Sequence, residues 1–566
     1  MRWTFKPLPN QTQVIDLAKS LSVSKTIASL LVQRGIFDYS QAKQFFRPQL
    51  SHLHNPFLMK DMELAVNRIE LAMAQQELIL IYGDYDVDGT TAVSLVSSYL
   101  KGIYNKVATY IPDRYDEGYG ISFKGIDFAN DNGISLIIAL DCGIKALEKV
   151  AYANQKNIDF IICDHHRPGD KLPNAIAVLD PKRADCTYPY DELCGCGIGF
   201  KLIQALSEKR QQNPNELIPY LDLVATAIAA DIVPITGENR ILSYFGLSVI
   251  NSNPRPGIKA LIGQTNKKDL NITDVVFTIA PRINAAGRMK HGRYAVELLT
   301  EMNFEQAEQF AKEIDVFNSN RRTADKTITQ QALKQIIENK EQTNSTTVVY
   351  KENWHKGVIG IVASRLIETY YRPTLVFTKS GEKLAASARS VHGFDLYNAL
   401  ELCAEHLEQF GGHKYAAGLT LLEENYQNFK VQFESIVKSS IPESCLIPEI
   451  LIDAPLDLCE ITPKFYRILK QMGPFGPENM NPIFVATGLR DNGYGKKIGQ
   501  DDLHLRLNII AGADFKTYQA VGFNLGSKYN LVSNGKAFKA AFTIEENYWN
   551  GNTTLQLNIK DLEADD

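Results

Sequence analysis

Three aspartates follow one short apolar run at every second position. The run is LILIYG at residues 78–83, and Asp84, Asp86 and Asp88 come directly after it. Carboxylates this close repel one another, which raises their pKa values unless a cation lies between them. Asp88, before GTTAVSLV, could serve as a helix cap, but capping does not account for three acids. The stretch therefore indicates a cation site.

Further acids and histidines follow other parts of the same region. Asp141 ends LIIALD, the triplet Asp164, His165 and His166 follows FIIC, and Asp231 ends a helical run of small residues. Taken singly, an Asp after a strand is usually a turn former. Together these residues supply the carboxylates and imidazole that suit Mn²⁺ or Mg²⁺. Two such ions, bridged by a carboxylate, favour in-line displacement at phosphorus, so we predict a centre that acts on phosphate esters.

These side chains need a scaffold that brings the ends of separate strands together. Short apolar runs at 78–83, 107–112, 136–141, 160–164 and 175–180 alternate with helical segments. This pattern is typical of a parallel sheet covered on both faces. Because ligands of such sheets collect at the carboxyl ends of the strands, the acids and histidines would meet there. We therefore predict a doubly wound α/β domain.

A chain of 566 residues is too long for one hydrophobic core and predicts several domains. Helical periodicity precedes the sheet, a long charged helix and a second α/β region follow it, and the last part has short β runs with Gly and Asn turns. We place an N-terminal helical segment at 1–60, the doubly wound domain at 61–302, a connecting helix at 303–342, the second α/β domain at 343–445 and a small barrel at 446–566.

Composition and charge set only broad limits. The net charge of −5 is not that of a typical nucleic-acid binder, but two divalent cations would offset most of it, and net charge does not report a local basic channel. Cys194-Gly-Cys196 is too tight for the usual zinc pair and favours reduced thiols in a loop. The sequence shows no signal core and no apolar run of about 18 residues, so we predict a cytoplasmic protein with no membrane partner.

The motifs GDYDVDG, ALDCG, DHH and ADIVP together resemble those of the DHH phosphoesterase superfamily. Their spacing and the later motifs are most similar to its RecJ branch, the single-strand-specific 5′→3′ DNA exonucleases. The resemblance covers nearly the whole chain and implies a DHH catalytic domain, a smaller DHH-associated α/β domain and a C-terminal OB-like barrel. It also implies two divalent metal ions, Mn or Mg, with the ligands Asp84, Asp86, Asp88, Asp141, His165 and Asp231.

The same resemblance implies roles for individual residues near the metals. Asp141 would bridge the two ions, and Asp164 would orient His165 through a hydrogen bond, as ligating histidines usually require. His166 would lie by the scissile phosphate and stabilise developing charge. In the basic stretch 276–299, Arg288 is the first choice to contact that phosphate. Arg282 and Asn284 of the same stretch are second choices, since either could instead support the loop.

A second group of motifs is expected to hold the substrate. Arg114 in YIPDRYDEGYG, together with Ser387 and Arg389 in LAASARSVHGFDL, resembles the family's pocket for a 5′-terminal phosphate. Gly412 and His413 lie in the glycine-rich turn FGGHKYAAGL, which matches the substrate-gripping domain of the superfamily. Taken alone, each of these stretches is also compatible with an ordinary glycine turn or basic loop.

The resemblance implies an exonuclease that releases 5′-mononucleotides from single-stranded DNA in repair and recombination, with single-strand-binding protein and a repair helicase as partners. One alternative is another hydrolase of the superfamily, acting on pyrophosphate, cyclic dinucleotides or very short oligonucleotides. The helical N-terminus and the terminal barrel favour a long polymer over these. A second alternative is a non-catalytic replication factor with this fold, but every expected ligand position holds an acid or a histidine.

Overall fold

The chain forms two compact units in its computed structural model. One unit combines residues 1–53, 234–244 and 449–566, and the other combines 54–233 and 245–448. The structure describes the chain apart from residues 264–266, 268, 511–515, 534, 550 and 566. Among the described helices, none is both long and apolar enough to cross a membrane.

The larger unit contains a parallel sheet of five strands in the order β3-β2-β4-β5-β6. The strands are β2 (Leu78–Gly83), β3 (Val107–Tyr110), β4 (Ile134–Leu140), β5 (Asp159–Cys163) and β6 (Ala177–Leu179). The central strands β2 and β4 are almost wholly buried, as a sheet covered on both faces requires. All five strands fall within or overlap the predicted apolar runs, and the doubly wound fold is confirmed.

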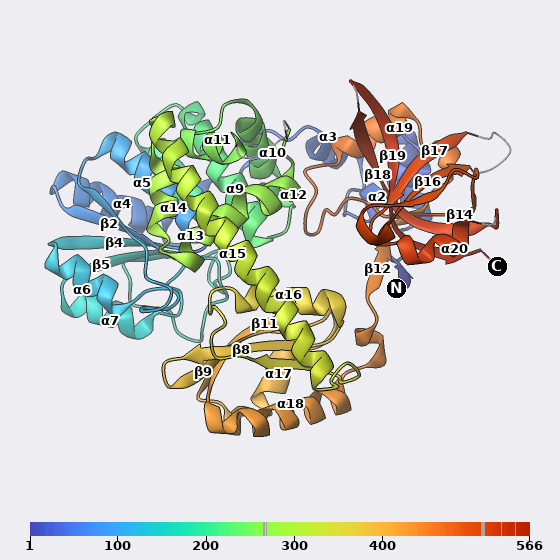
Figure 1. Cartoon of the computed structure of the whole chain (residues 1–566). Helices are drawn as coiled ribbons and strands as arrows, with labels where there is room; N and C mark the ends of the chain where they lie inside the picture. The colour runs from blue at the N-terminus through green and yellow to red at the C-terminus, as the bar shows by residue number, and fades with distance from the viewer. Residues whose placement is uncertain (264–266, 268, 511–515, 534, 550, 566) are drawn as a thin grey trace. The chain divides into compact units, whose positions relative to one another are not determined.

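Helices cover both faces of this sheet (Figure 1). One face packs against α6 (Phe123–Asp131) and α7 (Leu147–Gln155) through a shared apolar core. The other face packs against α4 (Met62–Ala74), α5 (Val87–Ile103) and α8 (Gly195–Lys209). The sheet is therefore held rigidly between two helical layers, and only the strand ends are free to carry a site.

A helical region follows the sheet. Its elements are α9 (Leu221–Asp231), α10 (Gly237–Ser252), α11 (Pro256–Gly263), α12 (Ile272–Asp274), a π-helical turn at Val275–Ile279, α13 (Ala280–Met289) and α14 (Arg293–Thr300). The long charged helix predicted from about 303 is α15 (Phe304–Glu338), and it begins at Asn303, whose side chain caps the amide of Gln306. It packs against α13 at one end and α16 at the other, so it links the two α/β parts of this unit.

The second α/β part has a five-stranded sheet in the order β10-β11-β9-β8-β7, in which only β7 and β8 are parallel. Its elements are β7 (Thr347–Tyr350), α16 (Ile359–Thr369), β8 (Thr374–Ser380), β9 (Lys383–Arg389), α17 (Leu396–Glu401), β10 (Gln409–His413), β11 (Ala416–Leu422) and α18 (Tyr426–Ser440). Phe429 and Phe433 of α18 fill the core on one face, and Val362 of α16 packs on the other with Ile336 of α15.

The smaller unit is built on a barrel. Its strands are β13 (Ala454–Pro455), β14 (Phe484–Asp491), β15 (Lys496–Ile498), β16 (His504–Ile510), β17 (Thr517–Gly522), β18 (Phe538–Trp549) and β19 (Asn552–Ala564), with α19 (Pro463–Gln471) and α20 (Tyr529–Val532) beside them. The sheet order runs β14-β18-β19-β17-β16, and β16 pairs again with β14. These five strands therefore close on themselves, and the predicted OB-like barrel is confirmed.

The N-terminal segment belongs to the core of this barrel unit. Helices α1 (Gln11–Leu21), α2 (Lys25–Val32) and α3 (Tyr39–Phe46) match the predicted periodicity, and their apolar faces join the barrel core. The sequence analysis missed β1 (Arg2–Phe5), which pairs in parallel with β12 (Glu449–Ile452). A four-residue strand whose partner lies at the far end of the chain gives no local hairpin signal.

Candidate functional site

The predicted strand-end residues lie at one edge of the parallel sheet. Asp84 follows β2, Asp141 follows β4, and Asp164, His165 and His166 follow β5. Because these strands are parallel, their carboxyl ends share that edge. Asp141 has a left-handed backbone with φ of 58°, which turns the chain sharply as it leaves β4.

Three further acids reach the same edge from helices. Asp86 is the N-cap of α5, where its side chain accepts a hydrogen bond from the amide of Gly89. Asp88 is buried in the first turn of α5, and Asp231 is the last residue of α9. The GDYDVDG motif is thus the turn from a buried strand into a buried helix, which holds its carboxylates close to the backbone.

His165 lies at the centre of this acidic cluster. Its Nε2 is 3.2 Å from Asp141 Oδ1, 3.6 Å from Asp231 Oδ2 and 3.7 Å from Asp88 Oδ2. The Nδ1 of His166 is 4.0 Å from the same Asp141 oxygen. Asp141, His165 and His166 form one group whose ligand atoms could surround a metal ion, and Asp88, His165 and Asp231 form another.

Burial and mutual repulsion perturb the acids of the cluster. Burial, followed by the charges of neighbouring carboxylates, raises the pKa of Asp84 and of Asp141 well above the usual range. The same causes raise the pKa of Asp88 to about 6 and that of Asp231 to about 8. The charge of Asp86 contributes to all four shifts, which places it within the cluster. Like charges gathered in this way need a compensating cation.

Several ligand atoms of the cluster are also unpaired. Asp84 Oδ2, Asp141 Oδ1 and both ring nitrogens of His165 are buried without a hydrogen-bond partner among the described residues. Burial lowers the pKa of His165 to about 3, so the ring is neutral and its nitrogens can act as ligands. Buried polar atoms are rarely left unpaired, and a metal site is one of the recognised exceptions.

The structure corrects the expected role of Asp164. We expected its carboxylate to orient the ring of His165, but Asp164 Oδ1 lies 2.8 Å from Nδ1 of His166 and accepts the backbone amides of His165 and His166. Its Oδ2 accepts the amide of Ile144 at 2.9 Å. Although burial opposes it, this pairing raises the pKa of His166, because a nearby carboxylate stabilises imidazolium.

A group of arginines lies beside the acidic cluster. The guanidinium of Arg114 stacks over the ring of Tyr85, 4.2 Å from its centroid. Arg288, on α13, donates from Nη1 to the carbonyl oxygen of Gly357 at 3.0 Å. Arg389, at the end of β9, donates to Ser387 Oγ at 3.2 Å and to a neighbouring carbonyl oxygen.

These arginines are close enough to repel one another. Burial, followed by the charges of Arg114, Arg389 and Arg321, lowers the pKa of Arg288 to about 10. Within the described part of the chain, the half-buried side chains of Arg114, Arg288 and Arg389 form no ion pair with a carboxylate. A cluster of this kind is suited to an anion that carries more than one negative charge.

The other predicted substrate residues are less clearly placed. Arg282 forms an ion pair with Asp315 of α15 at 3.0 Å and donates to the carbonyl oxygen of Thr278, so its guanidinium supports α13. Asn284 is half-buried on the same helix. Gly412 and His413 are exposed at the turn between β10 and β11. Among the described residues, no hydrogen bond or ion pair joins Asn284, Gly412 or His413 to Arg114, Arg288 or Arg389.

Comparison with known proteins connects this geometry to a family. Sequence models of three families match the chain: the N-terminal domain of the DHH family at 78–228, the DHHA1 domain at 343–439 and the RecJ OB domain at 452–561. The single-stranded-DNA-specific exonuclease RecJ of Bacillus subtilis is 36% identical, over 99% of this chain and 70% of its own length. RecJ of Salmonella typhimurium is 32% identical, over 88% and 89%.

The chain belongs to the RecJ family.

Solved structures of RecJ agree with this assignment. RecJ of Thermus thermophilus in complex with Mn²⁺ superimposes with a TM-score of 0.85 at 26% identity, covering 99% of this chain and 79% of that one. An exonuclease RecJ bound to manganese gives a TM-score of 0.61 at 29% identity, over 70% of this chain and 97% of its own. The resemblance expected from the motifs is thereby confirmed, as is the succession of DHH, DHH-associated and OB-like domains.

Two side chains next to the site were missed in the sequence analysis. The hydroxyl of Tyr119 lies 3.3 Å from Nε2 of His166 and 3.3 Å from the carbonyl oxygen of Asp141. Its place in the quoted motif YIPDRYDEGYG, five residues after Arg114, was the available signal. The charge of Arg321 on α15 helps to lower the pKa of Arg288, but nothing in the sequence distinguishes Arg321 from the other charged residues of that helix.

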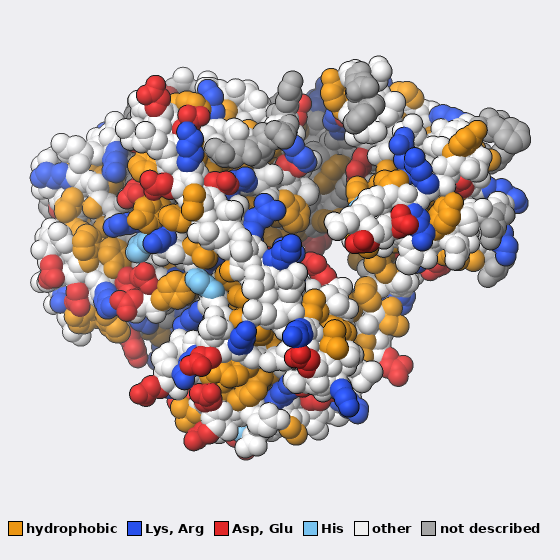
Figure 2. All heavy atoms as spheres, viewed as in Figure 1, with side chains coloured by type: hydrophobic (Ala, Val, Ile, Leu, Met, Phe, Trp, Pro, Cys, Tyr) orange, Lys and Arg blue, Asp and Glu red, His pale blue; other side chains and the backbone are white. Residues whose placement is uncertain are grey.

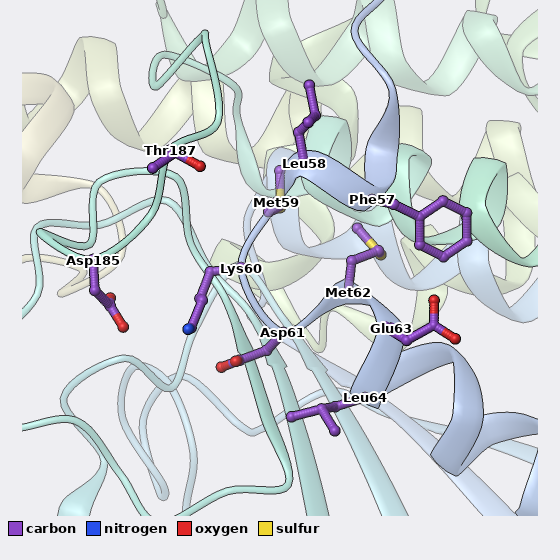
Figure 3. Close-up of a pocket in the computed structure, with 10 residues that line it drawn as sticks. All are labelled: Phe57, Leu58, Met59, Lys60, Asp61, Met62, Glu63, Leu64, Asp185 and Thr187. Carbon is purple, nitrogen blue, oxygen red and sulfur yellow. The ribbon is translucent and has the colours of Figure 1, made fainter.

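One cavity of the larger unit lies away from the acidic cluster. A cavity of about 310 Å³ lies where the chain enters α4 and contains Lys60, Asp61, Asp185 and several apolar side chains (Figure 3). Asp61 is already paired there with Arg183. On the face shown in Figure 2, Lys and Arg side chains are interspersed with Asp and Glu.

Proposed function

We propose that this chain is a metal-dependent 5′→3′ exonuclease that releases 5′-mononucleotides from single-stranded DNA, in repair and recombination. The observation that carries the proposal is the position of Arg288. The charges of Arg114 and Arg389 lower the pKa of Arg288, and the charge of Asp86 raises it. Arg288 is therefore close to the other arginines and to the acidic cluster. A phosphodiester beside the acids and a phosphate among the arginines could therefore belong to one DNA strand.

Two divalent cations, Mn²⁺ or Mg²⁺, fit the acidic cluster. Its buried carboxylates repel one another, and several of its ligand atoms have no partner among the described residues. The residues that would hold the ions are Asp84, Asp86, Asp88, Asp141, His165 and Asp231. When bound, such ions supply Lewis acidity that activates water and stabilises charge on the phosphate oxygens.

The arginines would select and place the substrate. Arg114, Ser387 and Arg389 form the proposed pocket for the 5′-terminal phosphate, and Arg288 the proposed contact to the scissile phosphate. Because a guanidinium matches two phosphate oxygens, these contacts would fix orientation as well as charge. Holding the chain end in this way presents the first internal phosphodiester for hydrolysis and sets the 5′→3′ polarity. Arg282 and Asn284 would only support α13.

His166 is proposed to stabilise the charge that develops on the scissile phosphate. Asp164 fixes its Nδ1, and the raised pKa keeps the ring protonated closer to neutral pH than a free imidazole. Its Nε2 faces the hydroxyl of Tyr119 at 3.3 Å. An imidazole whose two nitrogens are both held in place is preorganised, and a preorganised hydrogen-bond donor aimed at developing charge contributes strongly to catalysis.

We also propose further contacts to DNA and two protein partners. The OB-like barrel would bind single-stranded DNA beyond the cleavage site, and Gly412 and His413 would line the path of the strand. Single-strand-binding protein and a repair helicase would supply the substrate. A cytoplasmic location also stays a prediction.

The deciding experiment follows mononucleotide release from a long single strand with a 5′-phosphate and a labelled terminal nucleotide. Release that requires Mn²⁺ or Mg²⁺, proceeds from the 5′ end and is lost with EDTA is the expected result. A duplex of the same sequence, a 5′-hydroxyl strand, pyrophosphate and a cyclic dinucleotide are the comparison substrates. Faster hydrolysis of pyrophosphate or the cyclic dinucleotide than of the long strand would overturn the proposal.

A further inference from the structure

The segment Cys194-Gly195-Cys196, which the sequence analysis left as a loop with reduced thiols, starts α8 beside the acidic cluster. Cys194 is the N-cap of this helix, and its sulfur accepts the amide of Gly197. Gly195 and Cys196 are the first two residues of the helix and are fully buried. The first amides of a helix have no partner within the helix and must find one elsewhere.

Asp88 is the partner of both amides. Gly195 N donates to Asp88 Oδ2 at 2.6 Å, and Cys196 N donates to Asp88 Oδ1 at 2.8 Å. The carboxylate is thus held through both oxygens by the positive end of a helix, which favours its ionised form. Each oxygen keeps a second lone pair, and Asp88 Oδ2 is the atom that lies 3.7 Å from His165 Nε2.

Gly195 also contacts a second member of the cluster. A Cβ atom at position 195 would lie 2.5 Å from the Cβ of Asp141 and 2.8 Å from its Cα. Real Cβ atoms do not approach a backbone carbon so closely, so residue 195 must be glycine for Asp141 to occupy its place. A single residue on α8 therefore limits the positions of two acids, one on α5 and one after β4.

An ordinary structural reading is that Asp88 simply caps α8. That reading explains the two hydrogen bonds, but it does not require the capping carboxylate of Asp88 to lie among the candidate ligand atoms, or the capped residue Gly195 to abut Asp141. At a metal site, groups that hold the ligands commonly change the metal affinity tenfold to a hundredfold when they are altered.

We propose that Gly195 and Cys196 are positioning residues of the metal centre, which set Asp88 and Asp141 in place before any cation binds. Gly195 acts through its amide and its missing side chain, and Cys196 acts through its amide alone. The inference rests on the proposed function, because it assigns Asp88 and Asp141 to a metal centre. The thiol of Cys196 has no part in it.

The test measures Mn²⁺ binding to the full chain by electron paramagnetic resonance, together with thermal unfolding in EDTA. Gly195→Ala is expected to raise the Mn²⁺ Kd at least tenfold and to remove most of the Mn²⁺-induced rise in Tm. Gly197→Ala is the matched control, since its new methyl would meet only side-chain atoms, the nearest being 3.3 Å away on Leu193. It should bind Mn²⁺ as the natural protein does.

A second pair of variants covers the case in which Gly195→Ala does not fold. Cys196→Pro deletes one amide hydrogen in the first helical turn, where proline is tolerated, and Cys196→Ala keeps that hydrogen but removes the thiol. The proline variant should weaken Mn²⁺ binding about tenfold and the alanine variant should not.

Two outcomes separate this inference from the proposed function. The inference fails, while the proposed function stands, if the natural protein binds Mn²⁺ and either Cys196→Pro or a folded Gly195→Ala binds it equally well. If the natural protein binds no Mn²⁺, the proposed function itself fails.

Discussion

Arg288 and Gly357 join the two α/β parts of the larger unit. The guanidinium of Arg288 donates to the carbonyl oxygen of Gly357 at 3.0 Å, and the backbone carbonyl of Arg288 accepts the hydroxyl of Tyr115. A side chain at position 357 would collide with the Tyr115 hydroxyl and with the Arg288 backbone carbonyl. Its Cβ would lie 2.4 Å from the hydroxyl oxygen and 2.7 Å from the carbonyl oxygen. The arginine proposed to contact the scissile phosphate is therefore placed by a glycine of the other α/β part.

Gly357→Ala should disturb Arg288 without touching the acidic cluster. We expect kcat for release of nucleotides from long single strands to fall at least tenfold, because a shift of about 1 Å at a positioning group costs about a hundredfold. The Mn²⁺ Kd should be unchanged. Gly102→Ala, at a position with open space near the end of α5, is the control and should retain full activity. Normal kcat in Gly357→Ala would show that Arg288 does not depend on this contact.

Arg389→Gln should weaken the preference for a 5′-phosphate. A charged hydrogen bond contributes about 1.5–3 kcal/mol, so the ratio of Kd values for 5′-hydroxyl and 5′-phosphate strands should fall by about tenfold to a hundredfold. Binding is measured by fluorescence anisotropy in EDTA, which prevents cleavage. Arg322→Gln removes an exposed arginine of α15 and is the control for a general loss of positive charge. An equal effect in both variants would refute a specific terminal pocket.

Asp141→Asn should abolish hydrolysis and leave the fold intact. The carboxylate faces His165 and is surrounded by like charges, so its loss removes a central metal ligand while relieving repulsion. We expect nuclease activity to fall at least a thousandfold, about 4 kcal/mol in the barrier. In EDTA, the Tm should be equal to or higher than that of the natural protein. A variant that still requires Mn²⁺ and cleaves at the natural rate would exclude Asp141 from the metal centre.

Asp561 should make the barrel unit sensitive to acid. It is buried, and although burial opposes the effect, hydrogen bonds from Lys528 and from the indole of Trp3 lower its pKa. A carboxylate with a lowered pKa stabilises the fold above its unfolded pKa, near 3.8, and this contribution is lost as the pH falls through the folded value.

Asp561→Asn should therefore lower the free energy of unfolding at pH 7 by about 1.5–3 kcal/mol, and the Tm with it. The difference in Tm between this variant and the natural protein should shrink below pH 4. Thermal unfolding followed by circular dichroism, at pH 7 and at a pH below 4, measures this difference in Tm. Glu546→Gln breaks the exposed pair with Lys470 and should change the Tm little at either pH. A difference between Asp561→Asn and the natural protein that persists undiminished at low pH would contradict the assignment.

The fold was largely predictable because its signals are local. Each strand of the parallel sheet is a short apolar run, and Asp84, Asp141 and Asp164 directly follow three of these strands in the sequence, so their meeting at one edge follows from parallel topology. The barrel could be predicted for a similar reason, from short β runs separated by turn residues.

The prediction for Asp164 was wrong, and other details of the site were left undecided, because they depend on contacts between particular residues that the sequence pattern does not encode. Asp164 could serve either imidazole, and only the turn after β5 decides that its Oδ1 meets His166. The role of Gly195 depends on the approach of α8 to Asp141, which comes from packing and not from spacing. Arg282 and Arg288 differ by one helical turn and a half, yet one pairs with Asp315 and the other faces the arginine cluster.

The pairing of β1 with β12 has a consequence for how the protein is made. Arg2 and Glu449 are 447 residues apart, and the first helices share their core with strands near the other terminus. During synthesis residues 1–53 leave the ribosome before residues 449–566 have been made, whereas residues 54–233 and 245–448 can already pack together. The apolar faces of the first helices therefore stay uncovered until the strands that share their core have been translated.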